Sequence, residues 1–280
     1  MKVRQISCRQ ALVPSSLPGL DFALNPYRGC SHGCAYCYAP SVLRETREWG
    51  TFVDVKGDMP SVLLKDLTKK REGVVGIGTV TDPYQPIEAR YRVTRGCLRR
   101  LLDSPLRVCI QTKSSLITRD LDILTSFPRL DVGVTVTTLD EYTSRAVEPL
   151  ASTPRKRIET ISALSDEGVD VWAFIGPYLP GLDDEKALAL VRELKEAGAS
   201  RILGDRLRVR PGTLERMREA ADRMLPDERG PFLKDLEDVS YAGRAERALR
   251  SACEKLALEY QPAFPAERTG AESDRKAFSF

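Results

Sequence analysis

The chain of 280 residues has only one histidine, His32, and only one asparagine, Asn25. It has no hydrophobic run as long as a membrane span, and residues 1–8 lack the apolar stretch of a signal peptide. These absences argue against export and membrane insertion, so we expect a cytoplasmic protein with no membrane partner. The scarcity of asparagine is typical of thermophiles, although GC-rich coding would produce the same effect.

Neither sign of charge dominates. The 43 basic and 40 acidic side chains give a net charge of +3. This balance does not require a nucleic-acid partner, and it does not exclude a local basic groove. The hydrophobic fraction of 42% and the charged fraction of 30% describe a globular chain long enough for one large domain or two small ones.

Short apolar segments alternate with amphipathic ones, a pattern that favours a parallel sheet covered by helices. About six strand–helix units fall short of the eight in a closed barrel, so we predict an α/β fold built as a partial (β/α)6 TIM-like barrel. The predicted strands are Phe22–Leu24, Val74–Val80, Leu106–Thr112, Val132–Thr138, Val169–Ile175 and Arg201–Leu203.

The strand pattern stops after residue 210. We therefore predict an N-terminal extension over residues 1–20, the partial barrel over 21–210, and a helical C-terminal extension with a tail over 211–280. Within that extension, helices are expected over 211–225 and 243–260, and the tail begins at residue 261.

Three of the seven cysteines, Cys30, Cys34 and Cys37, form a C-x3-C-x2-C loop after the first predicted strand. A structural zinc site or a fully protein-ligated iron–sulfur cube needs four ligands. Three thiolates on a four-iron cube leave one iron open to a small molecule. The alternative is zinc with His32 as the fourth ligand, although its place between two of the cysteines makes a tetrahedron hard to close.

The remaining cysteines do not form a second cluster. Cys97 and Cys253 share helical stripes with apolar residues and are typical of core packing. Cys109 is predicted to face the barrel interior about 13 Å below Lys113, away from the cluster, given the rise of a strand. Cys8 gives no indication of a role.

The loop sequence N-P-Y-R-G-C-S-H-G-C-A-Y-C-Y resembles the radical S-adenosylmethionine (SAM) enzymes. Within that superfamily it is similar to the spore photoproduct lyase-like branch, whose members are often labelled DNA repair photolyases. Further similarity lies in T-D-P-Y-Q-P-I-E at 81–88 and T-L-D-E at 138–141, and the resemblance extends over residues 20–210.

The resemblance implies one [4Fe–4S] cluster on Cys30, Cys34 and Cys37, with SAM chelating the open iron. The side chains that it assigns to SAM are Tyr36, Thr81, Asp82 and Lys113. Strand alternation adds Thr135 and Thr137, which we expect to face the barrel interior and reach the ribose or methionyl end of SAM, although a buried threonine can instead bond its own strand. In this assignment Tyr36 supports adenine, Thr81 and Asp82 accept from the amino group, and Lys113 faces the carboxylate. The alternatives are an ordinary strand-ending turn at Thr81-Asp82 and a lysine that extends out of the barrel mouth.

Position 79 departs from the branch. Spore photoproduct lyases are understood to carry there a cysteine that returns a hydrogen atom to the product, whereas this chain has Thr79. A hydroxyl is a poor hydrogen-atom donor compared with a thiol, so the lesion-repair reaction is in doubt.

The leading hypothesis is therefore an enzyme that reductively cleaves SAM to a 5′-deoxyadenosyl radical for hydrogen abstraction from an unidentified substrate. Its partner would be an electron donor of the ferredoxin or flavodoxin type. The alternatives are spore photoproduct lyase-like DNA repair, and a non-enzymatic iron–sulfur or zinc module. Basic runs at 69–71, 99–100 and 155–157 permit a nucleic-acid substrate, although such runs usually only solvate a helix.

Overall fold

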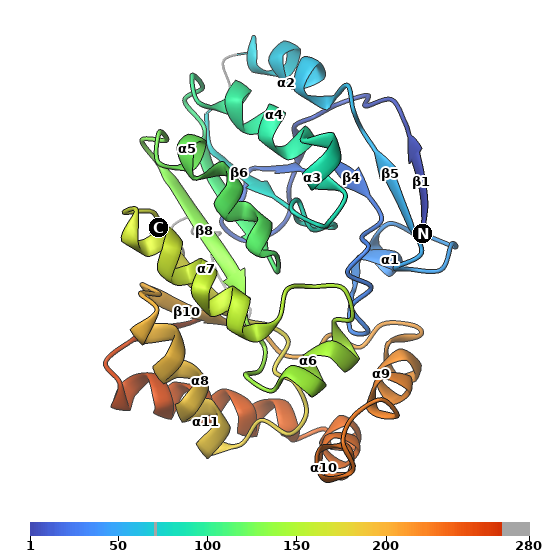
Figure 1. Ribbon diagram of the computed structural model, residues 1–280, viewed down its shortest axis with the longest axis vertical. Helices are drawn as coiled ribbons and strands as arrows, with labels where there is room; N and C mark the ends of the chain where they lie inside the picture. Colours follow the sequence, from blue (N-terminus) through green and yellow to red (C-terminus); the bar gives the residue numbers. More distant parts are fainter. Residues whose placement is uncertain (70–71, 265–280) are drawn as a thin grey trace, which may run out of the picture.

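The computed structural model describes residues 1–69 and 72–264, and over these its main sheet has eight strands in the order β11-β10-β9-β8-β7-β6-β3-β2 (Figure 1). Adjacent strands are parallel except β2 and β3, which pair antiparallel. The strands are β2 (Val13–Pro14), β3 (Phe22–Leu24), β6 (Val74–Ile77), β7 (Arg107–Thr112), β8 (Leu130–Thr135), β9 (Asp170–Ile175), β10 (Arg201–Gly204) and β11 (Glu259–Pro262).

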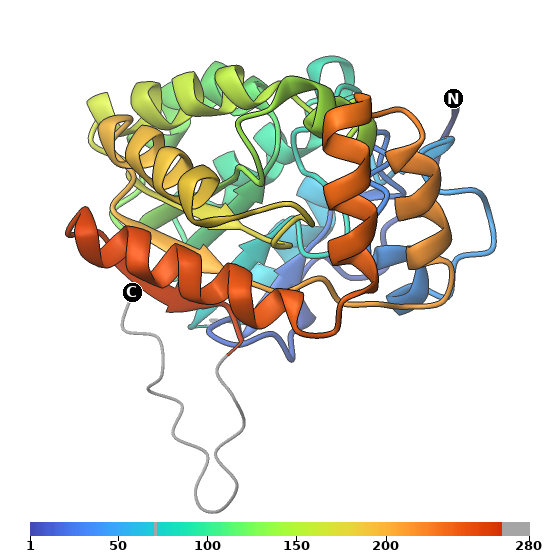
Figure 2. The same cartoon turned by 90° about the horizontal axis from the view of Figure 1, so that it is seen from below.

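Helices connect these strands and cover the outer side of the sheet, where α7, α8 and α11 lie next to one another (Figures 1 and 2). The helices are α1 (Ala39–Val42), α2 (Met59–Leu67), α3 (Glu88–Tyr91), α4 (Val93–Leu101), the 3-10 helix Ser115–Asp120, α5 (Leu121–Leu124), α6 (Glu141–Val147), α7 (Pro154–Asp166), α8 (Asp184–Glu196), α9 (Thr213–Ala221), α10 (Pro226–Glu237) and α11 (Tyr241–Lys255). The predicted α/β fold with a partial TIM-like barrel is confirmed.

Strand β7 shows how the sequence assigns two faces. Val108 and Ile110 are fully buried beneath the helices, whereas Cys109 and Gln111 are half-buried and line the interior of the barrel. This alternation follows from the two-residue period of a strand. It confirms the expectation that Lys113, two residues beyond Gln111, continues the inner face.

The C-terminal prediction was wrong in one respect. Helix α11 ends at Lys255, and residues 259–262 form β11, which pairs parallel with β10. A left-handed residue, Ala257 (φ 49°), reverses the chain, and the Leu258 amide closes the helix end on the Cys253 carbonyl at 3.0 Å. A strand of four residues is too short to show a period. The rest of the predicted tail, 265–280, lies outside the described residues.

The N-terminal segment joins the barrel through pairing. Strand β2 extends the main sheet, and β1 (Lys2–Gln5) pairs parallel with β5 (Phe52–Val55). Strand β4 (Tyr27–Arg28) pairs antiparallel with β5, which places the start of the cysteine loop on this smaller sheet.

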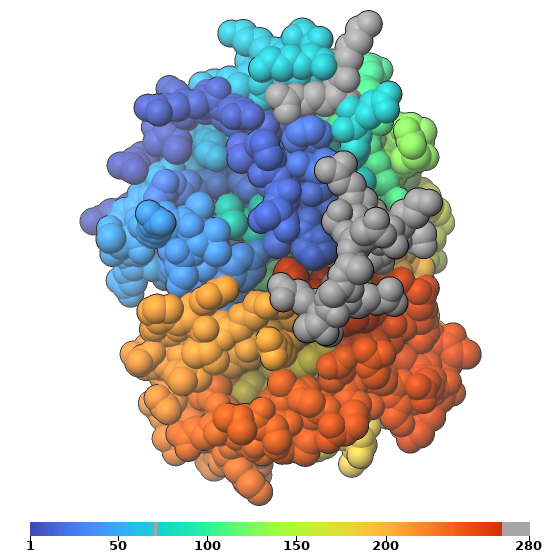
Figure 3. Space-filling view, turned by 180° about the vertical axis from the view of Figure 1, so that it is seen from behind, coloured from blue at the N-terminus to red at the C-terminus, as the bar shows by residue number. Residues whose placement is uncertain are grey.

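The described residues form two apolar cores. The main core joins the strands to their helices and includes the buried face of α11. The second core joins the cysteine loop to α6, α9 and α10, the last of which the sequence did not predict. Its buried members are Cys34, Ala35, Tyr36, Ala146, Val147, Leu179, Met217, Ala220, Ala221, Met224 and Phe232. The C-terminal helices α9 and α10 therefore pack against the cysteine loop. Figure 3 shows from the other face that orange C-terminal segments lie beside blue N-terminal ones.

None of the helices in the described part of the chain is both long and apolar enough to span a membrane.

Because Leu249 of α11 is fully buried in the main core, this helix contributes to the stability of the barrel. We expect Leu249→Ala to lower the free energy of unfolding by about 2–5 kcal/mol in a single transition, as for other buried leucines. Val239 is fully exposed and provides the control. Val239→Ala is expected to change the free energy of unfolding by less than about 0.5 kcal/mol. Urea unfolding followed by circular dichroism measures both. An early separate transition in Leu249→Ala would show instead that the C-terminal segment folds independently.

Candidate functional site

A cavity of about 400 Å³ opens at the carboxyl ends of the strands, where barrel enzymes gather reactive groups. It contains side chains from the cysteine loop, from the turns after β6 and β7, and from β8. The predicted site residues that line it are Cys30, Cys34, Tyr36, Cys37, Thr81, Asp82, Lys113 and Thr135. The structure thus brings together residues that are up to 105 positions apart in the chain.

Thr137 is not among the residues that line this cavity. It is buried, and its hydroxyl donates to Glu148 Oε1 at 3.5 Å. The structure therefore places Thr137 behind the predicted SAM side chains rather than beside them.

Two glycines allow the cysteine loop to turn against its neighbours. Gly29 has φ +86°, and a Cβ there would lie 2.5 Å from the Phe52 carbonyl oxygen of β5. Gly33 has φ +61° and faces Gly50 so closely that a Cβ would lie 3.4 Å from its Cα. Both positions need a residue without a side chain, so the spacing of the cysteines is tied to the glycines between them.

Gln85, from the segment 81–88, holds the cysteine loop through its side-chain amide. Its Oε1 accepts from the Ser31 amide at 2.8 Å, and its Nε2 donates to the Gly29 carbonyl at 3.3 Å and to Thr81 Oγ1 at 3.0 Å. Thr81 in turn donates its hydroxyl proton to the same Gly29 carbonyl at 2.7 Å. Thr81 therefore supports the loop, while its predicted contact with SAM stays a prediction.

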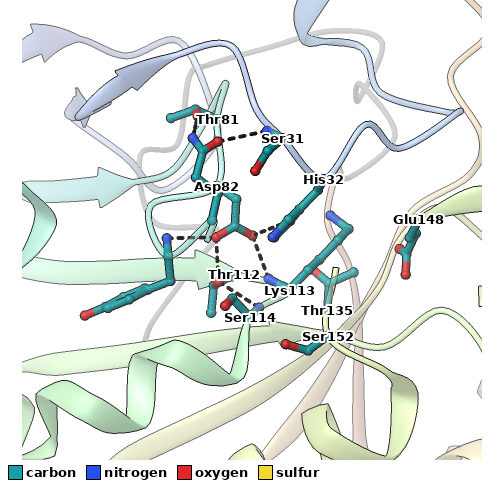
Figure 4. A network of polar contacts seen from close by, with 12 residues as sticks. Ser31, His32, Thr81, Asp82, Thr112, Lys113, Ser114, Thr135, Glu148 and Ser152 are labelled. Atoms are coloured by element: carbon teal, nitrogen blue, oxygen red, sulfur yellow. Dashed lines mark hydrogen bonds and ion pairs between the residues drawn. The ribbon is translucent and has the colours of Figure 1, made fainter. Parts of the chain in front are cut away.

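Asp82 is the centre of the polar network in Figure 4. Its Oδ1 accepts from the Tyr84 amide at 2.9 Å and from the Thr112 hydroxyl at 2.7 Å. Its Oδ2 accepts from the Lys113 amide at 2.7 Å and faces His32 Nδ1 at 3.4 Å. These four partners occupy the acceptor positions of one carboxylate. Its role as an acceptor for the SAM amino group stays a prediction, and in this arrangement it holds the cysteine loop and the end of β7 in place.

His32 is almost completely buried, and its Nδ1 is directed at Asp82. Burial lowers the pKa of His32, although Asp82 opposes this, which favours a neutral imidazole that donates to the carboxylate. The ring thus supports the loop rather than completing a zinc site, as its position between two cysteines suggested.

Lys113 is a cation of the cavity wall whose side chain extends between His32 and Glu148 (Figure 4). Burial alone would lower the pKa of Lys113, but the nearby Cys34, Glu148 and Asp82 raise it above its usual value. Its Nζ lies 5.6 Å from the centroid of the Tyr36 ring, and within the described residues it forms no ion pair. A charged amine without an acidic partner at a cavity suits a carboxylate ligand.

A buried ion pair between Glu148 and Arg157 lies behind the cavity, and the sequence had left both residues undecided between substrate binding and the surface. Arg157 also donates to the Ser152 carbonyl at 2.6 Å and to the Thr135 carbonyl at 3.1 Å. Glu148 accepts from the Tyr36 hydroxyl, which joins the cysteine loop to the end of β8. No spacing in the sequence predicts this pair, because Glu148 lies at the end of α6 and Arg157 lies in α7.

Cys30 and Cys34 are buried and Cys37 is half-buried, and burial raises the pKa of Cys30 to about 12 and that of Cys34 well above its usual value. The pKa of Cys37 is also raised by burial. Metal ligation would have to replace these protons. Within the described residues no three His, Cys, Asp or Glu side chains converge on one point suitable for a single ion. A four-iron cube binds each thiolate on a different iron, so it does not require the three sulfurs to meet at one point.

Thr79 and Cys109 also line the cavity. Asn25 donates to Thr79 Oγ1 at 2.8 Å and accepts from the Val80 amide at 3.0 Å, and the Tyr38 hydroxyl donates to the Thr79 carbonyl. The only asparagine thus fixes the turn after β6. Cys109 faces the barrel interior as expected and lines the same cavity, while its predicted separation from the cluster site stays a prediction.

The opposite wall and the mouth of the cavity come from the second half of the chain. Trp172 and Phe174 of β9 form an apolar wall, and Gly133 leaves room for the indole, since a Cβ there would lie 2.3 Å from it. At the mouth, the loop between β10 and α9 presents an arginine cluster, defined as Arg206, Arg208 and Arg210. Of these, Arg208 pairs with Asp205 at 2.9 Å and stacks on Phe264 at 3.9 Å from the ring centroid.

The fold and this site together define a radical SAM protein. The model of the radical SAM superfamily matches residues 24–194 of the chain, which is more than half of its length. The chain therefore belongs to the radical SAM superfamily.

Proteins similar in sequence occur in an archaeon, in mycobacteria and in a phage. An uncharacterized protein of Methanocaldococcus jannaschii is 32% identical over 66% of this chain and 70% of its own length. An uncharacterized protein of Mycobacterium tuberculosis is 34% identical over 75% of this chain and 66% of its own length. The radical SAM Nalpha-GlyT isomerase of Pseudomonas phage M6 is 26% identical over 56% of this chain but only 33% of its own.

Among solved structures, a variant of spore photoproduct lyase superimposes with a TM-score of 0.71 at 13% identity, covering 94% of this chain and 82% of the other. SuiB of Streptococcus suis bound to S-adenosylmethionine gives a TM-score of 0.56 at 15% identity, covering 94% of this chain and 52% of the other. At these identities the likeness shows the fold.

Because Asp82 satisfies buried donors from three segments, it should stabilise the protein even without a ligand. We expect Asp82→Asn to lower the free energy of unfolding by about 1–3 kcal/mol, since the amide nitrogen cannot accept from donors that the carboxylate now satisfies. Urea unfolding of the protein without SAM tests this. The exposed Asp103 provides the control, and Asp103→Asn should leave the midpoint unchanged. Equal midpoints for wild type and Asp82→Asn would contradict the structural role.

Proposed function

We propose that this protein binds one [4Fe–4S] cluster through Cys30, Cys34 and Cys37 and reductively cleaves SAM for hydrogen abstraction. The observation that carries the proposal is that the three loop cysteines and the unpaired cation Lys113 line one cavity at the strand ends. Three thiolates leave one iron of a cube open, and Lys113 supplies the charge that a ligand carboxylate requires.

When bound, the cluster and SAM supply the electron transfer and the 5′-deoxyadenosyl radical that abstracts hydrogen. The chain positions them and excludes solvent. Gln85 and Asp82 hold the cysteine loop, Glu148 orients the Tyr36 ring, and Trp172 and Phe174 keep the wall opposite apolar. An acidic or flavin-bearing electron donor of the ferredoxin or flavodoxin type would provide the electron.

The test of the cluster assignment compares two cysteines in the same chain. We expect Cys37→Ala to lose the iron and sulfide of the anaerobically reconstituted protein and to form no 5′-deoxyadenosine with dithionite, because the cube loses a ligand. Cys97, buried in α4 away from the cavity lining, provides the control, and Cys97→Ala should retain both.

If Cys37→Ala still cleaved SAM, the assignment of the loop would be wrong. A wild-type protein that takes up iron and sulfide but shows no change in its cluster spectrum on addition of SAM would favour the non-enzymatic electron carrier.

We further propose that the substrate carries nucleic-acid phosphates. The basic runs give less support. Arg157 is buried in an ion pair, Arg155 pairs with Glu159 at 3.0 Å, and two residues of the run 69–71 lie outside the described residues. The run 99–100 is exposed on α4 but is not among the residues that line the cavity. The arginine cluster supports a nucleic-acid substrate, because Arg206 and Arg210 are exposed at the cavity mouth and form no ion pair within the described residues. Aromatic side chains beside arginines suit bases and phosphates of a single strand.

Spore photoproduct lyase-like repair is the more specific form of this proposal, and several of the similar structures are of spore photoproduct lyase with a dinucleoside spore photoproduct. The threonine at position 79 speaks against the same hydrogen-return step here, so the proposal covers the class of substrate and not that lesion.

Binding of a fluorescein-labelled single-stranded DNA 12-mer tests the arginine cluster. We expect the double variant Arg206→Gln/Arg210→Gln to bind more weakly and to reduce the slope of log affinity against log salt by about 1.4, since each phosphate contact on a single strand contributes about 0.7. Arg155→Gln, which removes an exposed arginine elsewhere, is the control and should leave the slope unchanged. Equal slopes for all three proteins, or no binding by the wild type at low salt, would refute the proposal.

A further inference from the structure

Helix α9 holds the cysteine loop through one side chain, Arg216. Its Nε donates to the Ala35 carbonyl at 3.0 Å and its Nη2 donates to the Cys37 carbonyl at 3.3 Å. These two carbonyls belong to the segment between the second and third cysteines. Met217, the next residue of α9, is fully buried in the second core with Cys34 and Tyr36. The guanidinium is therefore fixed on both sides, by the loop carbonyls and by the packing of its helix.

The charge of Arg216 is not neutralised by an acid. Within the described residues it forms no ion pair, whereas Arg218 of the same helix pairs with Glu237 at 3.3 Å. Lys113 lies on the cavity side of the same loop segment, so two cations flank it. The Nη2 contact is made to the backbone of Cys37 itself, so the guanidinium charge lies next to the residue that carries the sulfur. The guanidinium thus brings a fixed positive charge to this part of the loop as well as holding its backbone.

We infer that Arg216 is a positioning residue that raises the reduction potential of the cluster held by Cys37. The inference rests on the proposed function, because it requires the cluster. One-electron reduction adds negative charge to the site, and a fixed positive charge nearby stabilises the reduced form more than the oxidised form. Net charge and hydrogen bonding around the sulfurs are the means by which proteins set such potentials. The C-terminal helix therefore makes the electron transfer that starts the reaction more favourable.

The experiment is a redox titration of the reconstituted protein without SAM, followed by electron paramagnetic resonance of the reduced cluster. We expect Arg216→Gln to lower the equilibrium constant for one-electron reduction about tenfold, which for a one-electron couple is about 59 mV in midpoint potential. Arg216→Lys keeps the charge, so its potential should stay near that of the wild type. Arg218→Gln, on the same helix, should leave the potential unchanged.

A purely structural role would give a different result. In that case Arg216→Gln and Arg216→Lys would both lose cluster content or thermal stability, and the clusters that remain would have the wild-type potential. A wild-type potential in Arg216→Gln, or a lowered one in Arg216→Lys, would overturn the inference. Neither result affects the proposed function, which fails only if the wild type takes up no iron–sulfur cluster or cleaves no SAM.

Discussion

The site depends on one buried carboxylate, Asp82, which satisfies donors from three separate parts of the chain. Asp82 accepts hydrogen bonds from the Tyr84 amide in its own turn and from the Thr112 hydroxyl and the Lys113 amide at the end of β7. It also faces His32 of the cysteine loop. A buried acid is stable only when its acceptor positions are occupied. The same four contacts that stabilise it therefore fix the loop relative to the strand ends.

Around this centre the buried charges are nearly balanced. Glu148 pairs with Arg157, and Asp82 is satisfied by neutral donors and His32, so Lys113 remains as a cation without an acid. Lys113 is half-buried, and a cation that is partly removed from water is costly unless an anion reaches it. Its neighbours Cys34, Glu148 and Asp82 nonetheless keep its pKa raised and the amine charged. The barrel thus maintains an unpaired charge at its cavity, which is an arrangement that a carboxylate ligand would complete.

The sequence could predict what local periodicity and local spacing encode. Six parallel strands, the inner face of β7 and the three-cysteine loop all follow from patterns within a few residues. It could not predict β11, which has four residues, or the contacts of Arg216 with carbonyls 181 and 179 positions earlier. Likewise the sequence showed Glu148 and Arg157 as two charged residues near a strand end, and only the packing of α7 on β8 buries them together.

The segment that matches the superfamily model ends before several of the residues that form the cavity. The superfamily model ends at residue 194, whereas residues of 205–210 and 263–264 form the cavity mouth. Arg216 of α9, which donates hydrogen bonds to the cysteine loop, also lies beyond residue 194. The chemistry shared by the superfamily needs the cysteine loop and the strand ends, all of which lie within the matched segment. The residues at the cavity mouth and the charge beside Cys37 come from the part of the chain after the matched segment. The entrance to the cavity and the charge beside Cys37 therefore depend on residues outside the segment that the superfamily model matches.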